Sequence, residues 1–237
     1  MNNHKKVIFM FDVTGIMAQP WLDHGYTAYC FDGQHPTGAH PDKDNPNYIK
    51  VGLWFTQDNE ENLKNILAVT GKDIHMVFGF PECTDLAVSG ATWFAKKRDF
   101  DPEFQTKAMT FVYLVELLGA MFNCPWALEN PVSVISTKWR KPDFSFHPYE
   151  YGGYLPDNDE HPTYPDYIKP RDAYPKKTCI WSGRGFREPK KAPVPVEDGY
   201  SDQHKKLGGK SLKTKNIRSA TPRGFAQAVF NSNKGSS

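Results

Sequence analysis

The chain has 237 residues, which is the length of one domain or of one domain with a smaller addition. Hydrophobic residues make up 39% and charged residues 24% of the sequence, which excludes a wholly disordered chain and supplies enough apolar side chains for a core. The net charge is only +2, but residues 1–181 carry 17 Lys/Arg against 23 Asp/Glu, whereas residues 182–237 carry 12 against 4. An acidic body is therefore followed by a basic tail.

Apolar runs typical of buried strands alternate with helical patterns along the chain. In chain order, we expect strands at residues 7–11, 27–31, 74–80, 125–128 and 178–181, a short helix begun by Pro20-Trp21, and helices at residues 58–69, 103–122 and 222–230. This alternation predicts an α/β fold, with a mostly parallel sheet and helices on both of its faces.

Several polar side chains stand at or just past the ends of the predicted strands, namely Asp12, Asp32, Cys83 and Glu129. In open α/β sheets, ligands bind beyond the carboxyl ends of the strands. We therefore expect these four side chains to converge on one cleft.

Two later stretches depart from the alternating pattern. Residues 136–176 mix Trp, Tyr, Pro and charged residues, which predicts an irregular excursion over the active edge rather than a second core. Residues 182–217 are basic and poor in apolar side chains, which predicts a loop or partly disordered segment. We therefore divide the chain into a catalytic core at residues 1–181 and 218–232, a basic loop segment at residues 182–217, and a disordered tail at residues 233–237.

The sequence argues against a membrane span, a secretory signal and a metal site. Its longest apolar run, residues 110–122, is short and is interrupted by Glu116. Polar residues lead directly into the first predicted strand, so we expect no signal peptide. The four cysteines are far apart and include no Cys-x-x-Cys pair, which predicts no bound metal and a reducing, cytoplasmic location.

The segment PECTDLAVSG, residues 81–90, places Cys83 in a tight turn directly after a buried strand. A thiol there would be exposed at the cleft, and a helix beginning nearby would favour the nucleophilic thiolate. The alternative is that Cys83 is a small buried apolar residue, a common role of cysteine. Glu129 is similarly either an acid–base group at a substrate or an ordinary loop acid.

Together, PECTDLAVSG and ALENPVS, residues 127–133, resemble the fourth and sixth motifs of the cytosine-5 DNA methyltransferases. Those motifs are a Pro-Cys turn and a Glu-Asn dipeptide at neighbouring strand ends. YPKKTCIW, residues 174–181, is similar to the eighth motif, and SATPRGFAQAV, residues 219–229, to the last one. FDVTGIMAQPW, residues 11–21, stands where the family has its glycine-rich cofactor turn.

The resemblance implies a Rossmann-like, S-adenosylmethionine-dependent methyltransferase fold and transfer of a methyl group to C5 of cytosine in DNA. Cys83 would form a covalent adduct at C6, and Glu129 would contact N3 and the exocyclic amine. Asn130, Lys177 and Thr178 complete the catalytic set that the resemblance implies. Its cofactor-binding set is Phe11, Asp12, Thr14, Gly15, Asp32, Phe80, Pro81 and Thr221.

The chain departs from the family pattern at several positions. Glu82 replaces the usual second proline of the cysteine turn, and only Gly15 remains of the glycine pattern. The interval in which family members usually insert a target-recognition domain shrinks to about residues 182–217, too short for an independent folded domain.

The basic residues of that interval are the candidates for phosphate contacts with duplex or single-stranded DNA. We assign this role to Arg184, Arg187, Lys190, Lys191, Lys210, Lys213, Lys215 and Arg218. The alternative is that these side chains only improve solubility. A short insertion reads little sequence, so a protein partner that supplies target recognition is also considered.

Three other functions stay open at this point. The first is a catalytically inactive, nucleic-acid-binding relative, and the second is a methyltransferase that acts on RNA or on a free cytidine nucleotide. The third is a cysteine hydrolase that pairs Cys83 with His75 or His147.

Overall fold

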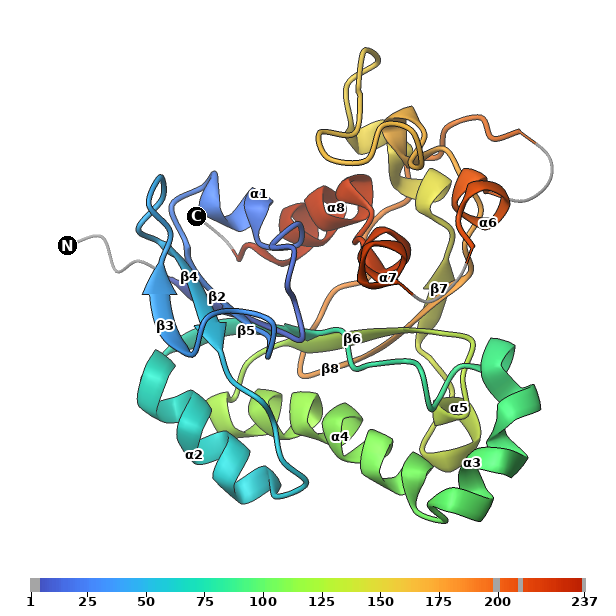
Figure 1. Cartoon of the computed structure of the whole chain (residues 1–237). Helices are drawn as coiled ribbons and strands as arrows, with labels where there is room; N and C mark the ends of the chain where they lie inside the picture. The colour runs from blue at the N-terminus through green and yellow to red at the C-terminus, as the bar shows by residue number, and fades with distance from the viewer. Residues whose placement is uncertain (1–4, 198–200, 209–210, 236–237) are drawn as a thin grey trace. The chain divides into compact units, whose positions relative to one another are not determined.

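The computed structural model of the chain describes residues 5–197, 201–208 and 211–235. The chain divides into two compact units, each described here by itself. The first comprises residues 1–145 and 178–186, and the second comprises residues 146–177 and 187–237. Figure 1 shows the chain coloured from its amino to its carboxyl terminus.

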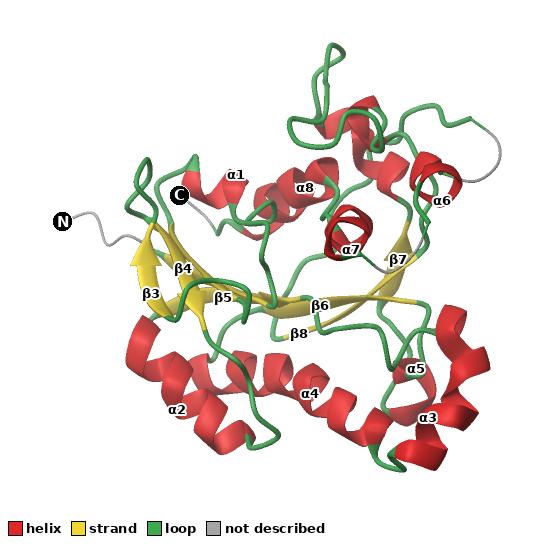
Figure 2. Ribbon diagram, viewed as in Figure 1, coloured by secondary structure: helices red, strands yellow, loops and turns green. Residues whose placement is uncertain are grey.

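The described residues form an eight-stranded sheet in the order β3-β4-β2-β1-β5-β6-β8-β7 (Figure 2). The strands are β1 (Lys6–Met10), β2 (Thr27–Phe31), β3 (Gly38–Pro41), β4 (Tyr48–Gly52), β5 (Ile74–Gly79), β6 (Trp126–Pro131), β7 (Phe144–Phe146) and β8 (Thr178–Gly183). The neighbours from β4 to β6 pair in parallel, whereas β3 pairs antiparallel with β4 and β8 antiparallel with β6. The predicted fold class, a mostly parallel Rossmann-like α/β sheet, is confirmed.

Helices of the first unit lie on both faces of this sheet. They are α1 (Gln19–Leu22), α2 (Asn59–Thr70), η1 (Val88–Trp93), α3 (Phe94–Phe100), α4 (Phe104–Phe122) and α5 (Ile135–Lys138). Figure 2 shows α2 and α4 along one face and α1 on the other. None of the helices in the described part of the chain is long and apolar enough to cross a membrane.

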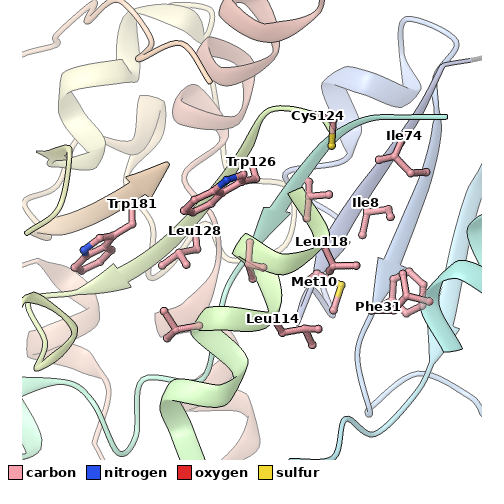
Figure 3. Packing of buried hydrophobic residues seen from close by; sticks show 14 of the residues in the cluster. Ile8, Met10, Phe31, Ile74, Leu114, Leu118, Cys124, Trp126, Leu128 and Trp181 are labelled. Carbon is pink, nitrogen blue, oxygen red and sulfur yellow. The ribbon is translucent and has the colours of Figure 1, made fainter. Parts of the chain in front are cut away.

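The core of the first unit lies between α4 and the centre of the sheet. Leu114 and Leu118 on α4 are fully buried in one cluster with Ile8, Met10 and Leu128 of the strands (Figure 3). Their removal from water is the main stabilising contribution in such a core. The helix therefore holds β1, β5 and β6 together, and with them the ends of those strands.

The elements predicted from the sequence are confirmed, with ends that differ by at most three residues. One difference of three residues is at the strand predicted at residues 125–128, because β6 continues to Pro131. Its partner β5 ends at Gly79, opposite Leu128, but β8 continues the antiparallel pairing as far as Pro131. Strands β3 and β4 were not predicted. Residues of β3 are all exposed, so this strand has no apolar pattern to reveal it.

The second unit contains the short turns η2 (Pro148–Tyr154) and η3 (Pro170–Asp172) and the helices α6 (Asp202–Lys206), α7 (Leu212–Ser219) and α8 (Arg223–Asn233). Its centre is aromatic: the ring of Phe225 stacks on Phe146 at 4.0 Å and contacts Tyr151 at 5.2 Å. The expectation that residues 136–176 contribute no second core is therefore wrong, although their irregular backbone is confirmed. Proline, glycine, polar and aromatic residues are mixed irregularly in this stretch and give no helical or strand period, so this core is not visible in the sequence.

The predicted basic loop also contains regular structure, because α6 and most of α7 lie within residues 182–217. Helix α7 begins at a Ser211 cap, whose side chain accepts a hydrogen bond from Thr214 N, and it buries Thr214 and Ile217. The compact units also group residues differently from the predicted catalytic core, since residues 146–177 and 218–232 lie in the second unit with residues 187–217 of the basic segment. The prediction of a disordered tail at residues 233–237 is wrong at Asn233, which ends α8, is buried and accepts a hydrogen bond from Arg187 N at 2.8 Å. Residues 236 and 237 of the predicted tail lie outside the described residues.

The substitution Gly119→Ala tests the packing between α4 and the sheet. A Cβ at this position would lie 2.1 Å from Cδ1 of the buried Trp126. Helix propensity alone favours Gly119→Ala by about 1 kcal/mol, but overpacking a core costs roughly 1–3 kcal/mol. We therefore expect Gly119→Ala to lower the free energy of unfolding, measured by chemical denaturation.

The control is Ala120→Gly on the exposed side of the same helix, which reports the propensity effect alone. A stabilised Gly119→Ala variant would show that Trp126 moves freely and would contradict the packing argument.

Candidate functional site

The carboxyl ends of the central parallel strands meet at one edge of the first unit. Register pairs Met10 of β1 with Gly79 of β5, and Gly79 with Leu128 of β6. Cys83 lies at this edge in the turn that follows β5, and Glu129 lies on β6 one residue beyond Leu128. The structure thus brings the two motifs together at adjacent strand ends.

Cys83 lies in the turn formed by residues 81–88, here called the cysteine turn, and is exposed to solvent. Its carbonyl oxygen accepts hydrogen bonds from Leu86 N at 3.0 Å and from Ala87 N at 2.8 Å. The backbone of Cys83 is therefore part of the hydrogen bonding that forms the turn. This exposure excludes the alternative that Cys83 is a buried apolar residue. A thiol needs such access to meet a substrate.

The other three cysteines differ from Cys83 in being buried. Burial raises the pKa of the Cys124 thiol to about 12 and that of Cys30 well above its ordinary value. Both therefore stay protonated near neutral pH and are poor nucleophiles.

Asn130 fastens the cysteine turn to β6. Its buried amide nitrogen Nδ2 donates a hydrogen bond of 2.8 Å to the carbonyl oxygen of Pro81, which lies 49 positions earlier in the chain. Two further backbone hydrogen bonds continue the contact, from Val88 N to Val132 O and from Val134 N to Leu86 O. The cysteine turn therefore has a defined position relative to the strand that carries Glu129.

Strand β8 brings Thr178 to the same edge. Thr178 is buried and pairs with Pro131, and the half-buried Glu129 pairs with Ile180. Lys177, which precedes this strand, is exposed and belongs to the second unit.

The turn after β1 is built around the buried carboxylate of Asp12. Its Oδ1 accepts hydrogen bonds from Thr14 N at 3.0 Å, Thr14 Oγ1 at 3.0 Å and Gly15 N at 2.8 Å. Its Oδ2 is buried and has no hydrogen-bond partner among the described residues. Burial raises the pKa of this carboxyl above its ordinary value. Oδ2 is an acceptor whose desolvation a bound donor would offset.

Tyr48 on β4 lies against this turn, and the sequence did not identify it as a residue near the site. Gly15 has a positive φ of 68°, and a Cβ there would lie 2.2 Å from the Tyr48 phenol oxygen. Glycine is needed here so that Tyr48 fits. The alternation in Tyr48-Ile49-Lys50-Val51 was the available signal for this strand.

The remaining predicted cofactor residues of the first unit lie at the same edge. Asp32 follows β2 directly, is half-buried, and its Oδ1 accepts a hydrogen bond from Gln34 N at 2.8 Å. Phe80 N donates to Met10 O, which ties the end of β5 to β1. The ring of Phe11 packs edge-on against Phe55, with the ring centroids 5.2 Å apart.

These residues fit S-adenosylmethionine chemically. Its ammonium and ribose hydroxyls are hydrogen-bond donors, and the acceptors at the ends of β1 and β2 are the buried Asp12 Oδ2, which has no partner among the described residues, and the Asp32 carboxylate. Thr221, the last of the predicted set, is buried in the second unit directly before Pro222, the N-cap of α8. The described residues contain no group of three or more His, Cys, Asp or Glu arranged to hold a metal ion.

Several predicted DNA-contacting cations already have local partners. Arg184 donates to Asn123 Oδ1 at 2.8 Å in the first unit. In the second unit, Lys191 pairs with Glu150 at 2.9 Å and Arg218 donates to Leu207 O at 2.7 Å.

The other cations of the predicted set are exposed. Lys213 lies 5.9 Å from the Tyr167 ring centroid. Arg187, Lys190 and Lys215 are likewise exposed, whereas Lys210 lies outside the described residues.

His75 does not lie near Cys83, so one predicted hydrolase pairing is wrong. It is the second residue of β5, at the amino end of the strand, and its ring packs against Trp21 and Tyr26. Cys83 follows the opposite end of that strand. His147 belongs to the second unit, where burial lowers its pKa.

A cavity of about 440 Å³ lies at the other end of β6, away from the cysteine turn. Trp126, Arg140 and Gly183 line it, together with Arg184, and it contains no other predicted site residue. We place the site at the carboxyl edge, because the candidate nucleophile and the buried unpartnered carboxylate oxygen are there.

No protein-family model and no curated protein matches the chain. Among solved structures, it is similar to one from E. coli described as a candidate DNA modification methyltransferase encoded within a prophage. The two chains are 13% identical with a TM-score of 0.41, and the match covers 76% of this chain and 46% of the other. The chain therefore spans less than half of that structure's length, and the fold assignment rests on the strand order, the pairing directions and the helix layers described above.

Replacing Asn130 tests whether its hydrogen bond to Pro81 stabilises the cysteine turn. Asn130→Ala leaves the buried Pro81 carbonyl without its donor, which costs about 1–3 kcal/mol. We expect that loss in chemical denaturation and faster proteolytic cleavage of residues 81–88.

Ser133→Ala is the matched control. Ser133 is buried beside the same turn, but its hydroxyl has no partner among the described residues, so its removal should cost little. Equal stability of the two variants would show that the Asn130 bond does not hold the turn.

Proposed function

We propose that this chain transfers a methyl group from S-adenosylmethionine to C5 of cytosine in DNA, with Cys83 as the nucleophile. The observation that carries this proposal is the buried Asn130 hydrogen bond to Pro81, because it links an exposed cysteine turn to the strand of Glu129. These are the two segments whose sequences resemble the cytosine-5 DNA methyltransferases. Both lie at the ligand-binding edge of a Rossmann-like sheet.

In this mechanism, the Cys83 thiolate adds to C6 of cytosine and forms a carbon–sulfur bond, which moves electron density to C5. When bound, S-adenosylmethionine supplies an electrophilic methyl group on a sulfonium, which becomes a neutral thioether after transfer. A base then removes the C5 proton, the Cys83–C6 bond breaks, and the thiolate and the C5–C6 double bond are restored.

Glu129 would contact N3 and the exocyclic amine and stabilise the charge that develops on the ring during attack. Strand pairing on β8 limits its movement, because Ile180 lies opposite it. Asn130 holds the turn, and Thr178 supports the end of the strand. Lys177 is retained as a candidate for orienting the base.

The cofactor would be held by the β1 and β2 strand ends. Asp12 Oδ2 would accept a hydrogen bond from a donor of the cofactor, and Asp32 would accept from the ribose hydroxyls. The backbone of Phe11, Thr14, Phe80 and Pro81 lines the same edge. Thr221 stays in the proposed set as a residue of the second unit.

If the substrate is duplex DNA, the target cytosine must leave the base stack before its C6 meets the thiol. The phosphate groups would then be contacted by the exposed cations Arg187, Lys190, Lys213 and Lys215. Lys210, which the sequence also predicts to contact phosphates, is part of the proposed set. A protein partner that supplies target recognition remains part of the proposal.

The Cys83 prediction tests the chemistry. The chain is incubated with labelled S-adenosylmethionine and, separately, with duplex DNA, single-stranded DNA, RNA and cytidine nucleotides, and nucleosides are then analysed by mass. We expect 5-methylcytosine in a DNA sample and at least about a thousandfold loss in Cys83→Ala, because the nucleophile is removed.

Ser89→Ala, an exposed residue on η1, is the matched control and should retain activity. Turnover by Cys83→Ala would rule out the covalent mechanism. Product only from RNA or nucleotide would reassign the substrate, and no product from any sample would favour a noncatalytic nucleic-acid-binding protein.

The Asp32 prediction tests the cofactor site. Asp32→Ala removes the carboxylate at the end of β2, so we expect the affinity for S-adenosylmethionine, measured by calorimetry, to fall about tenfold or more. DNA affinity should stay within about twofold.

Asp44→Asn removes the charge of an exposed acid on the loop that follows β3 and serves as the control. Unchanged cofactor affinity in Asp32→Ala would remove Asp32 from the site.

A further inference from the structure

The cysteine turn is held from a second side, by helix α3. The ammonium Nζ of Lys97 donates hydrogen bonds to Thr84 O at 2.9 Å and to Asp85 Oδ1 at 2.5 Å. Thr84 and Asp85 are the two residues that follow Cys83. We propose that Lys97 is a positioning residue for the Cys83 nucleophile, an inference that rests on the proposed function.

Lys97 is itself anchored to the core helix α4. The Phe94 ring of α3 lies 5.7 Å from the ring of Phe104, the buried first residue of α4, and Lys97 Nζ lies 5.9 Å from the same ring. The next residue of α4, Gln105, donates a hydrogen bond of 3.3 Å from Nε2 to Asp85 O. Thus α4 reaches the turn through both Lys97 and Gln105.

This route is independent of Asn130. Asn130 holds Pro81, two residues before Cys83, from β6, whereas Lys97 holds the two residues after Cys83 from α3. The nucleophile therefore lies between two anchored points that belong to different elements of the first unit. A reacting group placed 1 Å from its productive position loses about a hundredfold in rate, so such anchoring has a kinetic consequence.

The ion pair is suited to local positioning rather than to global stability. The side chains of Lys97 and Asp85 are 32% and 38% exposed, and partly exposed pairs add little to the free energy of unfolding. Its loss is expected to open the turn locally while the core stays folded. Positioning and folding are therefore separable by experiment.

The test compares Lys97→Met with Lys96→Met, which removes the exposed lysine next to it on α3. We expect hydrogen exchange of the Leu86 and Ala87 amides, which donate to Cys83 O, to become at least about fivefold faster in Lys97→Met and to stay unchanged in Lys96→Met. This readout uses the full chain without cofactor or DNA. It therefore decides whether Lys97 holds the turn even if no methyl transfer is detected.

The kinetic arm measures turnover on DNA that the wild-type chain methylates. Lys97→Met should lower kcat about tenfold or more and leave KM for DNA and for S-adenosylmethionine within about twofold, and Lys97→Arg should recover part of kcat by restoring the charged donor. Asp85→Asn, which keeps the fold but weakens the ion pair, should change exchange in the same direction. Unchanged exchange in Lys97→Met, or faster exchange with unchanged kcat, would overturn the proposal.

Discussion

One buried hydrogen bond, from the Asn130 amide to the Pro81 carbonyl, defines the geometry on which the rest of the candidate site depends. A carbonyl removed from water must find a donor, and here the donor comes from a residue 49 positions away on another strand. Asn130 follows Glu129 in the chain and Pro81 lies two residues before Cys83. The bond therefore sets the spacing between a candidate nucleophile and a candidate acid within one folded unit.

The antiparallel pairing of β8 makes this possible. In a sheet of parallel strands alone, β6 would lose its partner at Leu128, where β5 ends, and Glu129 and Asn130 would lie in a loop. Because β8 continues the ladder to Pro131, both residues stand on regular backbone. Groups on strands are held more accurately than groups on loops, which suits Glu129 to the role that we propose for it.

The structure reduces the number of basic side chains that are available to contact phosphates. Part of the basic tail is engaged within its own unit, through Lys191 with Glu150 and Arg218 with Leu207, and Arg184 is engaged in the first unit by Asn123. Cations with such partners are less available for phosphates. The nucleic-acid binding that we propose therefore depends on fewer side chains than the number of basic residues in the tail suggests.

The sequence by itself determined the α/β class and the central elements, because continuous apolar runs and the helical period of residues 104–122 reflect burial directly. It also located Cys83, Glu129 and Asp12 at or just past strand ends, since these residues follow continuous apolar runs. Only the tertiary structure decided the aromatic core of the second unit, the Tyr48 contact with Gly15 and the Lys97 contact with the cysteine turn. Each of these depends on contacts between residues distant in sequence, and such contacts leave no local period or composition from which they can be predicted.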